Sequence, residues 1–149
     1  MMSPFSRELR HEIEIDAPAD RVWAALTDTT DYSWNPFIHR LEGTLAVDEK
    51  LHVEIEPPNG RAMTFKPTVL DVEPARRLRW LGRFLVPGLL DGEHSFELEA
   101  RSENRTRFIQ SERFSGLLVG AVGRTLDKTE QGFAAMNAAL KSKVESETT

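Results

Sequence analysis

The sequence predicts an α+β fold in which a curved antiparallel sheet of about seven strands wraps around one long C-terminal helix. Between residues 37 and 114, polar and apolar side chains alternate in successive runs, which is typical of half-buried strands. Short turn signals separate these runs, and short turns join neighbouring strands in antiparallel order. From Val122 to Leu140, apolar residues recur every three or four positions, as on one face of a helix. No other segment of the sequence is long and amphipathic, so this helix must cover the apolar face of the sheet.

The N-terminal part of the chain predicts one strand followed by two short helices. Residues 11–15 alternate polar and apolar side chains. Pro18 suits the first turn of a helix, and the apolar side chains of residues 22–26 give that helix a buried face. Residues 29–36 are expected to form a second short helix or a turn.

About six strands should follow. The clearest of them cover residues 51–56, 63–72, 77–84, 93–100 and 107–114. Residues 57–60, which read PPNG, are a strong turn signal. Pro67 implies that the long strand 63–72 lies at an edge or contains a bulge. Beyond Lys143 the chain is polar, and we expect it to fray.

Length and composition limit the classes of protein that this chain can belong to. Its 149 residues suit a single domain, 1–149, with a core at about residues 8–143. A net charge of −5 argues against nucleic acid and anionic membranes as partners. The absence of cysteine excludes disulfides and thiolate metal sites. We see neither a signal peptide nor a membrane span, and expect a cytoplasmic protein.

Several short motifs together resemble a known superfamily. They are IEIDAPADRVW at residues 13–23, WNPF at 34–37, RW at 79–80, GEHSFEL at 92–98 and SERFSGLL at 111–118. On these motifs the chain resembles the START/Bet v 1-like superfamily, in its polyketide cyclase/dehydrase-type SRPBCC branch. The resemblance implies a helix-grip fold around an apolar cavity. It does not imply one activity, because the superfamily includes lipid carriers, hormone receptors, aromatase/cyclases and co-chaperones without a common catalytic set.

His94 and Glu112 are the candidate catalytic residues. His94 shares the inner face of its strand with Phe96, and could bind a ligand oxygen or act as a general acid or base. Alternatively, it is a structural histidine whose hydrogen bonds are satisfied. Glu112 falls on the inner face of the next strand, where a carboxylate is costly unless it is paired. It could meet His94 in a pocket, lie outside after a bulge, or pair structurally with an arginine.

The aromatic and apolar inner-face residues are expected to line a ligand cavity or to fill a core. An inner face that also carries histidine, glutamine and glutamate favours the cavity, because a filled core excludes such groups. The predicted ligand-binding residues are Trp34, Phe37, Phe65, Trp80, Phe84, His94, Phe96, Gln110, Glu112, Phe133 and Met136.

The arginines of the late strands are expected on the opposite, solvated face. Arg77, Arg79 and Arg83 alternate outward, and so do the glutamates of strand 93–100. Antiparallel neighbours would place these charges in cross-strand pairs. No exposed aromatic residue alternates with the arginines, so a nucleic-acid site is not expected.

Two glycine-flanked apolar loops, residues 85–90 and 116–120, could act as flaps over an opening. We expect them to form the mouth of the cavity together with the aromatic segment 34–37. The alternative is that the loops pack on each other and on the aromatic segment 34–37, and so close one end of the fold.

The leading functional hypothesis is a protein that binds a hydrophobic or lipid-like small molecule, anchored by His94, Gln110 or Glu112. The second is a cyclase, dehydratase or hydrolase acting on a carbonyl compound through His94 or Glu112. The third is a co-chaperone-like interaction module. No cofactor is expected, and no metal site, because the four histidines have no ligand spacing. A monomer and a dimer both stay open.

Overall fold

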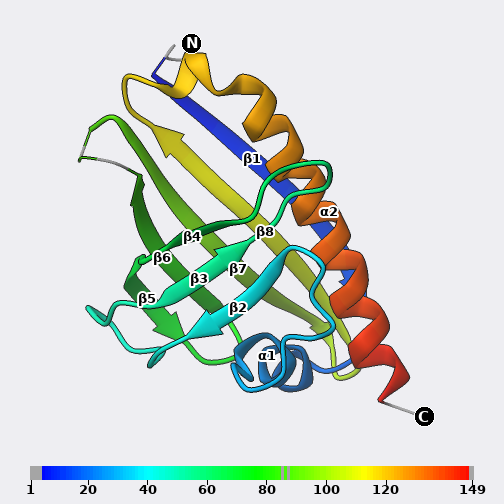
Figure 1. Cartoon of the computed structure of the whole chain (residues 1–149). Helices are drawn as coiled ribbons and strands as arrows, with labels where there is room; N and C mark the ends of the chain where they lie inside the picture. The colour runs from blue at the N-terminus through cyan, green and yellow to red at the C-terminus, as the bar shows by residue number, and fades with distance from the viewer. Residues whose placement is uncertain (1–4, 85, 87, 148–149) are drawn as a thin grey trace.

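The computed structural model describes residues 5–84, 86 and 88–147. It contains eight strands and two α-helices, and the long C-terminal helix runs along one side of the molecule next to the N-terminal strand (Figure 1). The strands are β1 (Ser6–Ile15), β2 (Ile38–Glu42), β3 (His52–Ile55), β4 (Met63–Phe65), β5 (Thr68–Glu73), β6 (Arg77–Phe84), β7 (Leu90–Ser102) and β8 (Arg105–Ser115). The helices are α1 (Ala19–Thr27) and α2 (Gly123–Ser146), and a 3₁₀ turn at Val119–Ala121 precedes α2. The predicted α+β class with a curved sheet and a long C-terminal helix is confirmed.

The strands form two antiparallel sheets. The larger has the order β1-β8-β7-β6-β5 and the smaller the order β2-β3-β4. A bridge between Lys50 and Thr68 joins the smaller sheet to the β5 edge of the larger one. The backbone nitrogen of Leu51 adds a bond to the carbonyl of Pro67 at 2.9 Å. The two sheets therefore continue one curved surface.

The predicted strand 63–72 is divided into β4 and β5, which belong to different sheets. Pro67 lies at the break, because it has no backbone N–H for a ladder bond. This division raises the expected number of about seven strands to eight. The bulge expected in this region does occur, between Val69 and Asp71 in the pairing of β5 with β6.

Of the two alternatives for residues 29–36, a short helix or a turn, the structure shows turns, and the second helix does not form. Side-chain oxygens there bind the backbone and compete with helical hydrogen bonds. Asp28 Oδ1 accepts from the backbone nitrogen of Thr30 at 3.2 Å. Asn35 Oδ1 accepts from those of Phe37 and Ile38 at 2.9 and 2.8 Å.

Helix α2 buries one face against the sheet. Its buried residues are Leu126, Thr129, Gly132, Phe133, Met136, Asn137, Leu140 and Val144. The expected fraying beyond Lys143 is wrong, because the helix continues to Ser146. Val144 is buried, and Glu145 accepts hydrogen bonds from the backbone nitrogen of Asp16 and from Lys141.

On the outer face of the larger sheet, some of the predicted cross-strand ion pairs are present, whereas Arg77 pairs with Asp71 and Glu73 of β5 instead of with the glutamates of β7. Arg79 pairs with Glu93, and Arg107 pairs with Glu99 at 3.7 Å and with Glu12. All of these side chains are partly exposed, so solvent screens each pair and its contribution to stability is small.

Phe37 packs against a glycine of the C-terminal helix. A Cβ built at Gly132 would overlap the Phe37 ring, which also makes an edge contact with Phe133 at 5.7 Å between centroids. The aromatic segment that precedes β2 is thus held against α2 by a position that has no side chain.

Gly132→Ala should destabilise the protein, although alanine is normally the better helix former by about 1 kcal/mol. The added methyl must displace the Phe37 ring, and overpacking of this kind costs about 1–3 kcal/mol. Gly123→Ala is the control, because its Cβ would meet nothing within 4 Å. Urea unfolding should show a loss of stability for the first variant and none for the second. Equal or greater stability of Gly132→Ala would contradict the packing.

Candidate functional site

A cavity of about 270 Å³ lies between the inner face of the larger sheet, the smaller sheet and the first half of α2. The sheets contribute mostly apolar side chains to its wall, among them Phe37, Ile38, Ile55, Phe65 and Phe114. The helix contributes Val122, Thr125, Leu126 and Thr129. Met63 and Thr125 are the exposed residues of the wall, so the cavity reaches the surface between β4 and the first turns of α2.

Two facing glycines help to keep this space open. Gly82 on β6 and Gly92 on β7 are directly paired, and both are buried on the inner face. A Cβ at Gly82 would come within 3.2 Å of the Phe65 ring. A Cβ at Gly92 would overlap Oε2 of Glu112. The sheet therefore offers no side chain at two adjacent inner positions.

Next to the glycines, a row of three side chains crosses the sheet. Trp80, His94 and Glu112 are successive register partners on β6, β7 and β8. The rings of Trp80 and His94 lie 5.2 Å apart. His94 Nδ1 lies 3.1 Å from Glu112 Oε1, and both residues are buried. Glu112 is therefore inside the fold, and the alternatives of a bulge or a structural arginine partner are wrong.

The pair is one end of a buried hydrogen-bond chain. His94 Nε2 lies 2.9 Å from Oε1 of Gln110. Gln110 Nε2 donates to Oδ1 of Asn137 on α2 at 2.8 Å. Asn137 Nδ2 donates to the backbone carbonyl of His11 on β1 and to the ring nitrogen Nδ1 of His11, both at 3.0 Å.

A backbone carbonyl fixes the direction of this chain. The carbonyl of His11 only accepts, so the Asn137 amide must present its NH₂ there and its oxygen to Gln110. Gln110 then presents its oxygen to His94, whose Nε2 must carry a hydrogen. The contact between His94 Nδ1 and Glu112 consequently holds one proton, which lies on either partner.

Two polar atoms of cavity-lining residues have no protein partner among the described residues. Glu112 Oε2 is one, since the hydrogen bond to His94 uses Oε1. The other is Nε1 of Trp80, which is buried without an acceptor. A buried donor without a partner costs about 1–3 kcal/mol unless a bound molecule satisfies it.

Six of the predicted ligand-binding residues line the cavity. They are Phe37, Phe65, Trp80, Phe84, His94 and Glu112. Five others are placed elsewhere: Trp34, Phe96, Gln110, Phe133 and Met136. Phe96, Phe133 and Met136 fill the core, and Gln110 lies behind His94 in the hydrogen-bond chain. Trp34 packs on Tyr32 and donates from Nε1 to the carbonyl of Asp31 at 3.1 Å.

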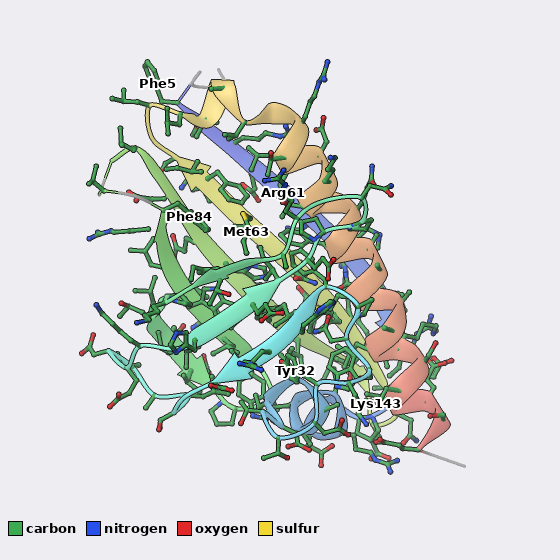
Figure 2. The ribbon with its side chains drawn as sticks, in the orientation of Figure 1. Phe5, Tyr32, Arg61, Met63, Phe84 and Lys143 are labelled. Carbon is green, nitrogen blue, oxygen red and sulfur yellow. The ribbon has the colours of Figure 1, made fainter. Side chains whose placement is uncertain are left out.

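The three segments expected to form the mouth of the cavity do not all line it. Figure 2 shows Tyr32 beside α1, whereas Met63 and Phe84 lie toward the other end of the molecule. The two apolar loops instead bond to each other, since Gly88 and Leu89 accept from the backbone nitrogens of Leu117 and Leu118 at 3.2 and 2.9 Å. In loop 85–90, residues 85 and 87 lie outside the described part. From the described residues of these segments, only Phe37 and Leu90 line the cavity.

The sequence did not predict several residues of the cavity wall, nor the role of Asn137 in the hydrogen-bond chain. Met63, Thr125 and Thr129 line the cavity, and Asn137 holds Gln110. Asn137 lies next to Met136 on the apolar face of α2. An asparagine on that face indicates a polar partner in the sheet, and the inner-face residue Gln110 was available for that pairing. Among the described residues, no group of three or more His, Asp or Glu side chains could hold a metal ion. No described helix is long and apolar enough to cross a membrane.

The fold and the cavity together define a helix-grip protein with an internal site for a small molecule. The model of the family described as polyketide cyclase/dehydrase and lipid transport matches residues 6–145, and the chain belongs to this family. The search of curated proteins found no match. Family membership and the cavity support binding of a small-molecule ligand between the sheet and α2.

Solved structures with low sequence identity share this fold. The Zhui aromatase/cyclase from Streptomyces sp. R1128 is 18% identical, with 97% of this chain and 96% of that chain covered and a TM-score of 0.78. A norcoclaurine synthase point mutant from Thalictrum flavum is 16% identical, with both chains covered completely and a TM-score of 0.74. Protein MLL2253 from Mesorhizobium loti is 20% identical, with 96% and 99% covered and a TM-score of 0.70.

Asn137→Leu should destabilise the protein by about 2 kcal/mol, because it leaves the buried amide nitrogen of Gln110 without an acceptor and removes a donor from the carbonyl of His11. Ser142→Ala, an exposed position on the same helix, is the control and should change stability by less than about 0.5 kcal/mol. Urea unfolding of both variants measures the difference. Equal free energies of unfolding for the two variants would show that the fold does not depend on the hydrogen-bond chain through Asn137.

Proposed function

We propose that this protein binds a mostly apolar small molecule in the cavity between the sheets and α2. The observation that carries the proposal is the composition of the wall, in which aromatic and aliphatic side chains surround a single buried His94–Glu112 pair. An apolar surface with few fixed polar groups is typical of small-molecule sites. The cysteine-free composition supports a reducing compartment, and a cytoplasmic location is part of this proposal.

A bound apolar molecule would gain free energy here for two reasons. It would replace water, which is poorly held by a space with few polar partners. It would also leave water itself, at about 25 cal/mol per Å² of apolar surface removed. The His94–Glu112 pair then orients the molecule, because a polar group of the ligand is satisfied only at that side of the wall.

Thr125→Trp should block this cavity at its surface opening. Thr125 is exposed and lines the wall, so a large side chain there obstructs access with little strain on the core. The neutral fluorescent probe N-phenyl-1-naphthylamine should bind the unmodified protein and bind Thr125→Trp about tenfold more weakly, a difference of about 1.4 kcal/mol.

Arg124→Trp is the matched control. It adds the same side chain to the neighbouring exposed position, which does not line the cavity. Equal weakening by both variants, or no binding by the unmodified protein, would count against the proposal. Native mass spectrometry of the protein as purified offers a second view, through the mass of any retained apolar molecule.

Proton transfer is the second candidate function, and the position of Glu112 favours it. Its carboxyl group shares one proton with His94 and also faces the cavity, so it could take a proton from the carbon next to a ligand carbonyl. If so, the protein should accelerate deuterium exchange into 2-tetralone, and Glu112→Gln should abolish the acceleration. NMR of the ketone in deuterium oxide measures it. No acceleration by the unmodified protein would speak for binding alone.

A further inference from the structure

We propose that Oε2 of Glu112 is a hydrogen-bond acceptor subsite, and that the cavity takes an apolar ligand bearing an alcohol or phenol hydroxyl. This inference rests on the proposed binding function and gives the ligand's polar group a chemical identity. Three features of the described residues support it: the direction of the buried hydrogen-bond chain, the free oxygen and the glycine beneath that oxygen.

The direction of the chain makes Oε2 an acceptor in both protonation states of the pair. If the shared proton lies on His94 Nδ1, Glu112 is a carboxylate and both of its oxygens accept. If the proton lies on Oε1, it donates to Nδ1 and Oε2 is the carbonyl oxygen of a carboxylic acid, which also accepts. The carbonyl of His11 sets this order through Asn137 and Gln110.

Because Gly92 has no Cβ, there is room for Oε2 of Glu112 next to it. The oxygen lies directly over the Cα of Gly92, where the Cβ of any other residue would overlap it. Register pairs Gly92 with Phe114 and His94 with Glu112, so the oxygen leans diagonally across the sheet from Glu112 toward Gly92. Gly92 is therefore a positioning residue for the subsite.

The ligand group that fits an acceptor in apolar surroundings is a neutral donor. A hydroxyl satisfies Oε2 and adds no charge to the cavity. A carboxylate brings only acceptors and a negative charge, and a ketone oxygen also only accepts, so neither satisfies Oε2. Desolvating an unmatched polar group costs about 1–3 kcal/mol, which makes the hydroxyl the discriminating feature.

Two probes of the same shape test the subsite: 2-naphthol, which donates, and 2-methylnaphthalene, which does not. The measured quantity is the ratio of their dissociation constants, so that differences in overall apolar binding cancel. Glu112→Leu should shift the ratio about tenfold toward 2-methylnaphthalene. Glu112→Gln should keep it within about threefold, because the amide nitrogen can donate to His94 Nδ1 and leave its oxygen as the acceptor.

A glycine pair provides a test that leaves Glu112 in the protein. Gly92→Ala should shift the ratio in the same direction as Glu112→Leu, because the methyl displaces Oε2. Gly82→Ala, its register partner, meets Phe65 instead and should alter binding of both probes without changing the ratio. An unchanged ratio in Gly92→Ala and Glu112→Leu, with both probes still bound, would overturn the subsite and leave the binding function standing. Failure of the unmodified protein to bind either probe would overturn both.

Discussion

The arrangement of this protein depends on the buried amide of Asn137, which ties the long helix to two strands at once. Its two ends are satisfied by β8 through Gln110 and by β1 through the carbonyl of His11. Sliding or rotating α2 would leave several buried polar groups without partners, at about 1–3 kcal/mol each. Apolar contacts alone tolerate such movements, since they have no direction. The amide therefore sets where along the sheet the helix lies.

This anchoring has a consequence for the cavity. Thr129 lies eight positions before Asn137 on the same helix, or about 12 Å along its axis. The helix is fixed at Asn137, and its first turns are consequently held over the part of the sheet that lines the cavity. At the other side, Phe37 is held against Gly132. The space remains because its boundaries are anchored by contacts outside it, while two facing positions have no side chain to fill it.

Much of this organisation can be predicted from the sequence, because alternation along a strand decides which face each side chain occupies. That rule placed His94, Gln110 and Glu112 together on the inner face, as the structure shows. The only sequence signal for the division of residues 63–72 was Pro67. A proline can mark an edge, a bulge or a break, and which of these occurs depends on the sheet that each half joins. The pairing of β1 with β8 and the role of Asn137 are long-range contacts, and no local pattern specifies them. Trp34 was misplaced for a different reason: its partners, Tyr32 and the carbonyl of Asp31, are local, whereas a place in the cavity wall was expected.

The same hydrogen-bond chain bears on whether the site holds a molecule or changes it. A ligand hydroxyl that donates to Glu112 adds no net charge to the wall. Transfer of its proton would leave an anion beside a positively charged pair, and the chain through Gln110 and Asn137 ends at a backbone carbonyl that cannot take up that charge. Such an anion needs a donor of its own in apolar surroundings. Among the described wall residues, Trp80 has a buried N–H without an acceptor. Proton transfer thus requires a donor for the ligand's anion, whereas binding requires only a hydroxyl that reaches Glu112.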